Sequence, residues 1–250
     1  MKRWLPSLAL VAAAIGLWEL VVRAADVPDY LFPAPSAVAS ALADDAGLLA
    51  DATAVTAREM VLGYLLAVVL ALALAVALHL SAVLRRAVLP LLVVSQTVPT
   101  VVFAPILAIL LGYGIGPKLV VVAIVCFFPI VVNAVDGLGA ADPELVRMMR
   151  TLHGTRWGLF RRVELPGALP MIFSGARVAA TYAAVGAVFG EWAGSSEGLG
   201  FVMLQSQPSL DTARIFAAVV ILSLLALALY GAVTLAERLL VPWRWEAAGA

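Results

Sequence analysis

Two long stretches of this chain contain no Asp, Glu, Lys or Arg, and they restrict the possible folds more than any other feature. They cover residues 60–80 and 87–111. A bilayer core of about 30 Å is crossed by a helix of about 20 apolar residues, so each stretch is long enough to span a membrane. Charged residues make up only 13% of the chain and hydrophobic residues 64%, whereas a soluble domain carries about 25% charged residues. The sequence predicts an all-α, polytopic membrane protein.

Apolar runs of this kind predict about six transmembrane helices in a single transmembrane domain, residues 1–250. The first begins with Met-Lys-Arg, like a signal peptide, but its apolar stretch is longer than a typical signal-peptide core, so we interpret it as a helix. The six expected spans cover approximately residues 4–22, 60–80, 87–111, 117–135, 171–191 and 215–236.

Basic residues predict the orientation, because Lys and Arg accumulate in short cytoplasmic loops. Six spans place both termini on one side. The loop from Ala24 to Ala57, on the other side, has five Asp and no Lys or Arg. We therefore expect cytoplasmic termini. The expected cytoplasmic side holds Lys2, Arg3, Arg85, Arg86, Arg147, Arg150, Arg156, Arg161, Arg162, Arg238 and Arg244.

One polar segment, Asp142–Pro170, interrupts the apolar pattern and is expected to lie in the cytoplasm as a helix–turn–helix. Asp142 as N-cap, Pro143 at the first position and Glu144 in the first turn are typical of a helix start. The first helix would carry one apolar stripe, made of Leu145, Met148, Met149 and Leu152.

The second half of the polar segment predicts another short helix. Gly154 is the expected C-cap of the first helix and Thr155 the N-cap of the second. Two Leu-Pro pairs, at 165–166 and 169–170, are expected to end the second helix and turn the chain back into the membrane. Its expected apolar side consists of Trp157, Phe160 and Val163. An alternative is an interfacial helix pair that rests on lipid headgroups through its arginines.

Several function classes are disfavoured by what the sequence contains. The single cysteine, Cys126, lies within an expected span and is interpreted as a small core residue. A net charge of zero argues against a nucleic-acid partner. There is no phosphate-binding G-x-x-x-x-G-K-[ST] motif, and Gly112-Tyr-Gly-Ile-Gly116 is expected to be a turn. We therefore expect no catalytic residue, no cofactor and no metal site, and a chain that is not itself an enzyme.

The polar segment resembles the cytoplasmic coupling loop of ABC-importer permeases, the binding-protein-dependent transport inner-membrane component family. That family's pattern is Glu-Ala-Ala, three residues, Gly, nine residues, an aliphatic residue, one residue, and Leu-Pro. Alignment on Leu165-Pro166 puts Val163 at the aliphatic position and His153 at the Gly position. The Glu-Ala-Ala positions fall on Arg147, Met148 and Met149. Gly154, one place later, is expected to take over the role of the glycine.

Other fragments extend the resemblance over most of the chain. Phe32-Pro-Ala-Pro-Ser36 is similar to an element of the nitrate, sulfonate and taurine branch, and Gly190-Glu-Trp192 and Gly198-Leu-Gly-Phe201 also fit the family. Leu210-Asp-Thr-Ala213 looks closest to permeases for pyrimidine precursors of thiamine. The resemblance implies an importer of such a precursor. Sulfonate or taurine, nitrate and riboflavin are the alternative solutes.

The resemblance implies a type I, MetI-like ABC importer permease of a bacterial inner membrane. Its implied partners are a separate ABC ATPase, an extracytoplasmic solute-binding protein, a second permease copy in a homodimer, and membrane lipid. The polar segment would dock on the ATPase, and Phe160→Asp would abolish solute-coupled ATP hydrolysis in an inserted permease. The candidate coupling residues are Arg147, Met148, Met149, Arg150, His153, Gly154, Arg156, Trp157, Phe160, Arg161, Leu165 and Pro166.

Polar residues within the spans are candidates for a solute pathway, because they are costly to expose to lipid. Asn133 and Glu191 have an alternative interpretation as ordinary helix-end groups, and Arg177 is expected to extend to the cytoplasmic interface. The pathway candidates are Gln96, Thr97, Asn133, Thr181, Tyr182 and Glu191. Gly186 and Gly190 form a G-x-x-x-G motif, which predicts close helix packing at a dimer interface.

A stand-alone secondary transporter or channel is an alternative from another class, as is a membrane scaffold without transport activity. A secondary transporter typically shows internal repeats and intramembrane charges for ion coupling. Central Asp, Glu and Lys residues are nearly absent from the spans of this chain, and no inverted repeat is visible. The pattern therefore favours an ATP-driven importer subunit.

Overall fold

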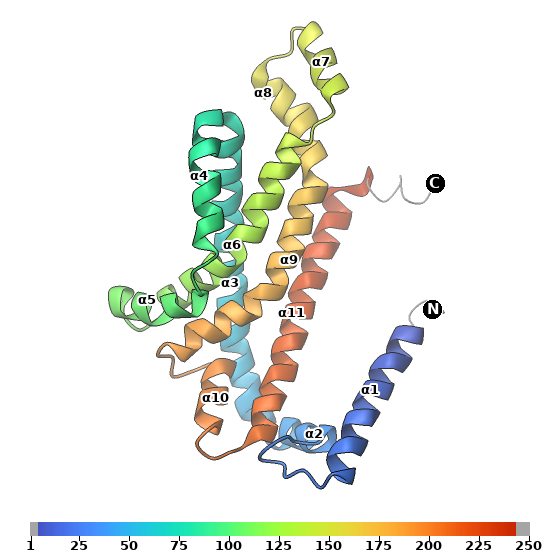
Figure 1. Ribbon diagram of the computed structural model, residues 1–250, viewed down its shortest axis with the longest axis vertical. Coiled ribbons are helices and arrows are strands. Elements are labelled where there is room, and N and C mark those ends of the chain that lie inside the picture. Colours follow the sequence, from blue (N-terminus) through green and yellow to red (C-terminus); the bar gives the residue numbers. More distant parts are fainter. Residues whose placement is uncertain (1–4, 244–250) are drawn as a thin grey trace. The chain divides into compact units, whose positions relative to one another are not determined.

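The structure, a computed structural model, describes residues 5–243, and those residues form helices without any strand (Figure 1). The all-α class is therefore confirmed for the described part of the chain. Lys2, Arg3 and Arg244, which contributed to the predicted orientation, lie outside the described residues. In chain order the helices are α1 (Leu5–Ala24), α2 (Pro35–Asp44), α3 (Ala46–Leu80), α4 (Ala82–Ser95), the 3-10 helix η1 (Thr100–Val102), α5 (Phe103–Leu111), α6 (Ile115–Gly139), α7 (Pro143–Thr151), α8 (Arg156–Leu159), the π-helical η2 (Phe160–Glu164), α9 (Leu165–Trp192), α10 (Leu199–Ser206) and α11 (Thr212–Leu240).

Five of the described helices are long and apolar enough to cross a membrane, or six if one bent pair forms a single span. The bent pair is Ala82–Ser95 with Thr100–Leu111, whose axes differ by 84°. We expected a span over residues 87–111, and the structure differs by breaking it in the middle. Pro99 explains the break, because proline has no N–H for the helix and disfavours helical geometry at the residue before it.

The fifth span also differs from the prediction. Helical structure runs without interruption from Arg156 to Trp192, so the expectation that the two Leu-Pro pairs end a helix is wrong. The N–H of Leu165 bonds to the carbonyl of Phe160, five residues earlier, and this wider turn precedes Pro166. Pro166 then follows as the second residue of α9, and this local widening of the helix accommodates a residue that has no N–H to donate.

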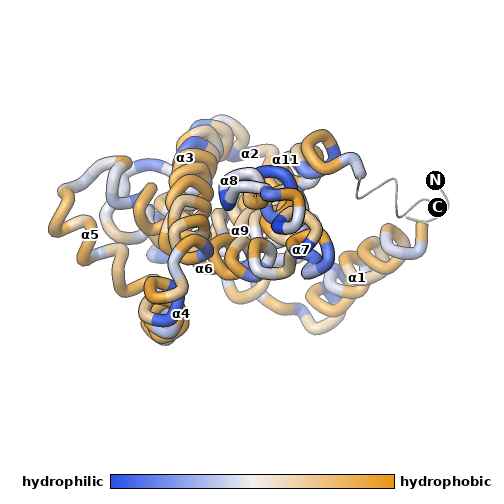
Figure 2. Tube along the Cα trace, turned by 90° about the horizontal axis from the view of Figure 1, so that it is seen from above, coloured by the Kyte–Doolittle hydropathy of each residue, from blue (hydrophilic) through white to orange (hydrophobic). Residues whose placement is uncertain are grey.

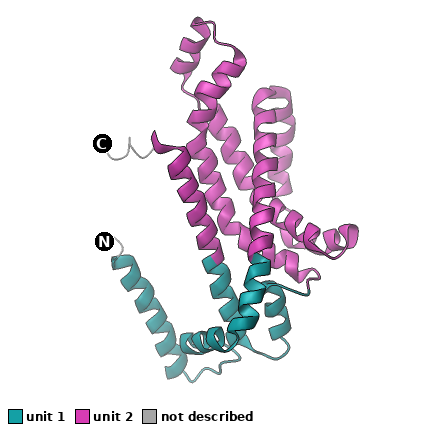
Figure 3. Cartoon of the chain, turned by 180° about the vertical axis from the view of Figure 1, so that it is seen from behind, with its two compact units in different colours: residues 1–56, 196–224 teal, residues 57–195, 225–250 magenta. Residues whose placement is uncertain are grey.

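The described residues divide into two compact units (Figure 3), one within residues 1–56 and 196–224 and one within residues 57–195 and 225–250. In the second unit, α6 and α9 run side by side and form an extensive helix pair (Figure 1). Small residues of α9 allow this approach. A Cβ added at Gly175 would lie 2.5 Å from the carbonyl oxygen of Pro129, and one at Gly186 would lie 2.9 Å from the Cα of Val122.

The G-x-x-x-G motif is therefore used within the chain. Gly186 and Gly190 are buried, and a Cβ at Gly190 would lie 3.0 Å from the Cα of Lys118 in α6. The prediction that these two glycines form a dimer interface is wrong, because both face α6 of the same chain. Close backbone approach is what such motifs provide in a membrane, and the sequence did not identify the partner helix.

Hydrogen bonds from α3 and α6 to the backbone of α9 stabilise the same core. The hydroxyl of Tyr64 donates to the carbonyl of Ala176 at 2.9 Å, and Cys126 Sγ lies 3.3 Å from the carbonyl oxygen of Ala179. Cys126 is fully buried, which confirms its interpretation as a small core residue.

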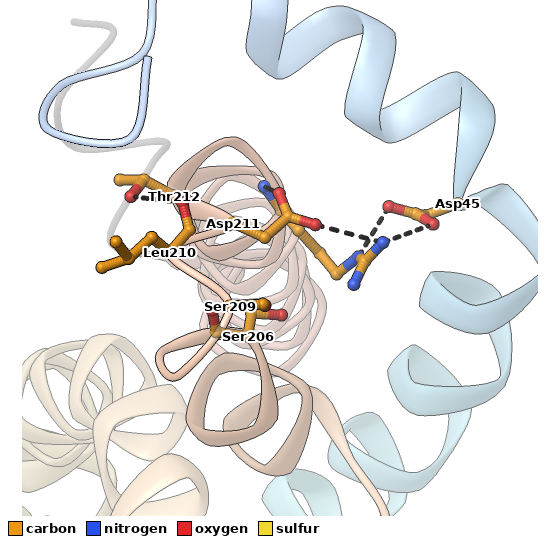
Figure 4. A network of polar contacts seen from close by, with 7 residues as sticks. Asp45, Ser206, Ser209, Leu210, Asp211 and Thr212 are labelled. Carbon is orange, nitrogen blue, oxygen red and sulfur yellow. Dashed lines mark hydrogen bonds and ion pairs between the residues drawn. The ribbon is translucent and has the colours of Figure 1, made fainter. Parts of the chain in front are cut away.

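In the first unit, Arg214 forms an ion pair with Asp45, which is labelled in Figure 4. Its Nε lies 2.7 Å from Asp45 Oδ2 and its Nη2 lies 3.1 Å from Asp45 Oδ1, a bidentate arrangement. Asp211 accepts from the backbone N–H of Arg214 at 3.1 Å. Asp211 and Thr212 belong to the Leu210–Ala213 motif, and the Thr212 hydroxyl donates to the carbonyl of Tyr30 at 2.6 Å. These contacts give the motif a structural role at the start of α11.

Candidate functional site

The polar segment lies past one end of α6 and α9, where α7 and α8 form its helical arms (Figure 1). Hydrophilic residues gather on these arms (Figure 2). The predicted N-caps are confirmed. Asp142 accepts from the N–H of Glu144 at 2.8 Å, and Thr155 accepts from the N–H of Gly158 at 3.1 Å. Both helix starts were therefore readable from local sequence alone.

The turn between α7 and α8 differs from the prediction in one residue. The N–H of Gly154 donates to the carbonyl of Met149 at 2.9 Å, and the N–H of His153 donates to the carbonyl of Arg150 at 3.2 Å. This pair of bonds is a Schellman motif, whose left-handed position is His153 with φ of 54°. His153 itself thus takes the left-handed position of the turn, and Gly154, the expected C-cap, does not.

Gly154 is nevertheless required to be small. A Cβ at this position would lie 2.7 Å from the carbonyl oxygen of Met149, which is the acceptor of its own N–H bond. The turn therefore depends on both residues. His153 adopts the left-handed backbone conformation, and Gly154 allows the chain to pass close to the carbonyl of Met149.

The apolar stripe on α7 is exposed. Leu145, Met148 and Leu152 are 44%, 51% and 69% exposed, and Trp157 is 64% exposed. Phe160, in contrast, is only 5% exposed and packs beneath Trp157, with ring centroids 5.4 Å apart. The expectation that Phe160 is a docking anchor is therefore wrong, because its ring belongs to the core. Phe160→Asp would place a charge in that core, so it does not isolate a docking role.

Two of the arginines in the polar segment contact their own chain. Arg147 Nε donates to the carbonyl of Pro143 at 3.2 Å, and Arg156 Nη2 donates to that of Leu80 at 3.3 Å. Arg150 and Arg161 are exposed. Charges of this kind at the edge of an interface contribute to steering more than to affinity.

A link to α3 fixes the second half of the polar segment. His79 Nε2 lies 2.8 Å from Glu164 Oε2, and both side chains are 16% exposed. The ring of His79 lies 6.1 Å from that of Phe160. Together with the bond from Arg156 to Leu80, these contacts tie the end of α3 to α8 and η2. No local pattern in the sequence predicts this contact, because His79 and Glu164 are 85 residues apart.

The solute-pathway candidates do not form one cluster in the described chain. Gln96 lines a cavity of about 360 Å³ beside the break in the third span, together with Ser95 and Thr100; we call it the break cavity. The Thr97 hydroxyl donates to the carbonyl of Val94 at 2.8 Å.

The remaining candidates lie on α6 and α9. Asn133 donates to the carbonyl of Pro129 at 2.8 Å, and Thr181 to that of Val178 at 2.7 Å, each within its own helix. Tyr182 is 49% exposed, and Glu191 is fully buried. The buried position of Glu191 contradicts its alternative interpretation as a solvated helix-end charge.

Two buried ion pairs were not foreseen. Arg177 pairs with Glu237 of α11, whose side chain is fully buried, so the expectation that Arg177 extends to the interface is wrong. Lys118 Nζ lies 2.6 Å from Glu59 Oε1 and 2.6 Å from Ser195 Oγ. The only signal for these pairs in the sequence is the presence of charged residues inside or beside apolar spans, where unpaired charges are costly.

Comparison with known proteins agrees with this arrangement. The family described as "Binding-protein-dependent transport system inner membrane component" matches residues 63–244. The chain belongs to this family. It is 36% identical over 228 residues to a probable ABC transporter permease protein of Haemophilus influenzae, covering 91% of this chain and 93% of that protein.

Two further relatives have solutes in their names. A formylaminopyrimidine transport permease protein of Halalkalibacterium halodurans is 35% identical over 229 residues, covering 91% of each chain. A riboflavin transport system permease protein of Chloroflexus aurantiacus is 37% identical over 232 residues, covering 92% of this chain and 86% of that protein.

Family membership confirms the resemblance and the MetI-like permease fold. The chain is an ABC importer permease, a multi-pass membrane protein and a transport subunit rather than an enzyme. The stand-alone channel, the secondary transporter and the scaffold are thereby set aside.

Proposed function

We propose that this permease forms the membrane path of an importer in which the polar segment is cytoplasmic and docks on a separate ABC ATPase. The observation that supports this most directly is the exposed apolar stripe of α7, formed by Leu145, Met148 and Leu152, with Trp157 beside it. Met and aromatic side chains are enriched at the centres of protein interfaces. Exposed together in the polar segment, they favour a protein partner over lipid headgroups alone.

A docking surface transmits motion only if it is rigidly attached to the spans. Helical structure continues from Arg156 to Trp192, so displacement of α8 would be carried directly into α9. The His79–Glu164 and Arg156–Leu80 contacts attach the same region to α3. Movement of the polar segment would therefore shift α3 and α9 together as a rigid body, which changes access to the path.

For the solute, we propose a pyrimidine precursor of thiamine, delivered by an extracytoplasmic binding protein. The formylaminopyrimidine permease relative supports this choice, and the riboflavin permease relative supports riboflavin as the second candidate. Sulfonate, taurine and nitrate remain alternatives from the wider branch. The expected location is a bacterial inner membrane with both termini in the cytoplasm.

A second copy of the chain is also proposed, as a homodimer, and it requires a surface other than Gly186 and Gly190, which α6 occupies. The side of α9 that carries Val178, Tyr182 and Val185 is exposed and lies in the span that moves with the polar segment. Two copies related by this face would enclose a path between them.

Affinity purification and reconstitution test the proposal. The tagged permease, extracted from the membranes of its source cells, is expected to co-purify with an ABC ATPase. Reconstituted with that ATPase and the binding protein, it should accumulate formylaminopyrimidine only when ATP is present. Uptake driven by an ion gradient without ATP would contradict the proposal, and ATP-driven uptake of taurine alone would contradict the solute.

A further inference from the structure

We propose that the break cavity is a solute site on the transport path and that it takes a small, uncharged, planar heterocycle. This inference rests on the proposed import function and names the chemical class that this site selects. The cavity is formed by α3, α4, η1, α5 and α6 within one compact unit of the chain. It adjoins the point where the third span bends by 84°.

The break itself supplies polar groups at the depth of the apolar spans. Non-helical backbone inside a membrane is tolerated where it is buried in protein or lines a cavity. Here the chain between Ser95 and Thr100 leaves α-helical geometry, and Ser95, Gln96 and Thr100 all line the cavity. Ser95 donates its hydroxyl hydrogen to the carbonyl of Leu92 at 2.7 Å, so its oxygen retains acceptor capacity.

The rest of the lining is apolar and aromatic. Phe103 of α5 and Phe127 of α6 both line the cavity, together with leucines of α3 and α4. Such a combination, apolar and aromatic walls with a few polar groups, is typical of small-molecule sites, whose volumes start at about 300 Å³. At about 360 Å³, the break cavity is at the small end of that range. A single flat ring can pack against phenylalanine faces.

The charge of the lining selects between the candidate solutes. The residues that line the break cavity, all in the described part of the chain, include no charged side chain. A sulfonate or nitrate anion, or zwitterionic taurine with its sulfonate and ammonium groups, would lose its hydration there without a charged partner, which is strongly unfavourable. An aminopyrimidine is uncharged, and its ring nitrogens and amino group match the amide of Gln96 and the hydroxyl of Thr100. The cavity thus favours a pyrimidine over the solutes of the branch that carry charged groups.

Thiol protection tests this site in the full-length permease embedded in lipid nanodiscs. Thr100→Cys places a thiol in the cavity, while the native Cys126 is buried and a parallel Cys126→Ala series controls for it. A ligand with Kd near 1 mM, present at about 10 mM, should slow maleimide labelling about tenfold by occupancy. Formylaminopyrimidine is the probe, and zwitterionic taurine at the same concentration is the comparison that carries charged groups.

We expect formylaminopyrimidine to protect Thr100→Cys and taurine to leave its labelling unchanged. Adding Gln96→Leu should remove the protection, whereas the matched change Gln205→Leu, in α10 and outside the cavity, should preserve it. Absence of protection, equal protection by taurine, or protection that survives Gln96→Leu would each overturn the proposal. So would a thiol that is unreactive in lipid but reactive after solubilisation, because an acyl chain would then fill the cavity.

Two additional measurements keep the result decisive. If Thr100→Cys does not fold, saturation-transfer NMR of the unmodified permease with formylaminopyrimidine and taurine replaces it, and Gln96→Leu must abolish the pyrimidine signal. Co-purification with an ATPase and ATP-dependent uptake are measured on the same preparations. ATP-driven uptake without pyrimidine protection would overturn the site alone, and loss of ATP dependence would instead overturn the proposed function.

Discussion

The α6–α9 pair and the polar segment differ in how completely their residues are packed against the same chain. Gly175, Gly186 and Gly190 bring α9 so close to α6 that an added Cβ would meet neighbouring atoms at 2.5 to 3.0 Å. In the polar segment, Leu145 and Met148 are left about half exposed, at 44% and 51%. The pair is complete within one chain, whereas the polar segment presents a surface that needs a partner. Substitutions in the pair should therefore change stability, and substitutions on α7 should change coupling.

The largest stability effect is expected at Lys118, where the α6–α9 pair meets α3. Its Nζ contacts Glu59 Oε1 at 2.6 Å, and the two side chains are only 12% and 3% exposed. Lys118→Met would leave the Glu59 carboxylate buried without its cation, at a cost of about 3–5 kcal/mol. The thermal unfolding midpoint in nanodiscs measures this effect.

Two controls accompany that measurement. Arg58→Met removes an exposed charge from the same region and should change the midpoint little. The double variant Lys118→Met/Glu59→Gln should recover much of the loss, because a neutral pair avoids the uncompensated charge. A midpoint that is unchanged in Lys118→Met would show that the ion pair is not formed in the membrane.

The next effect is expected at Gly175 in α9. Gly175→Ala would place a Cβ 2.5 Å from the Pro129 carbonyl oxygen and 2.7 Å from Asn133 Cβ, and backbone atoms cannot easily yield. We expect destabilisation of about 1–3 kcal/mol from overpacking. Gly167, in the same helix, has nothing within 4 Å of an added Cβ, so Gly167→Ala should be neutral or stabilising by up to about 1 kcal/mol. Equal effects of the two substitutions would contradict the close packing of α6 on α9.

In the polar segment, Met148→Asp is expected to affect coupling rather than stability. Met148 is exposed, so the free energy of unfolding should change by no more than about 0.5 kcal/mol. Solute-stimulated ATP hydrolysis in the reconstituted importer should fall about tenfold, equivalent to about 1.4 kcal/mol of lost docking. Met148→Leu, which keeps the apolar side chain, should retain activity. If Met148→Asp retains full coupled hydrolysis, the α7 stripe does not dock on the ATPase.

The sequence predicted most where the determinants are local. The fold class follows from apolar runs, and the N-caps Asp142 and Thr155 follow from single residues next to their helices. Predictions failed where a residue's role depends on its partner. Phe160 and Trp157 are both aromatic residues on the expected apolar side of one helix, yet Phe160 is 5% exposed and Trp157 64%, and the ring of His79, distant in the sequence, lies 6.1 Å from that of Phe160. A G-x-x-x-G motif likewise indicates close packing without naming the helix that it packs against.

The effect of a proline on a helix also depends on residues distant in the sequence. Pro99 and Pro166 both follow a residue of an expected helix, yet the chain breaks at the first and continues through the second. At Pro166 the π-helical turn of η2 comes first and the proline lies in the first turn of α9. At Pro99 the preceding residues leave the helix instead, and polar side chains accompany the break. Local propensity predicts that a proline perturbs a helix, and tertiary packing decides how.

The smallest effect is expected at His153, where the polar segment departs from the family pattern. A non-glycine residue in the left-handed region costs roughly 1–2 kcal/mol relative to ordinary helical geometry, and His153 has φ of 54°. His153→Gly should therefore stabilise the α7–α8 turn by up to about 1 kcal/mol, which corresponds to about fivefold slower hydrogen exchange at the Gly154 amide. His153→Val should accelerate exchange, because a β-branched residue is least tolerant of positive φ. The expected order of protection is Gly, then His, then Val. Equal protection in all three would mean that the turn does not use the left-handed conformation, and a docking surface built across α7 and α8 would then lack a fixed geometry.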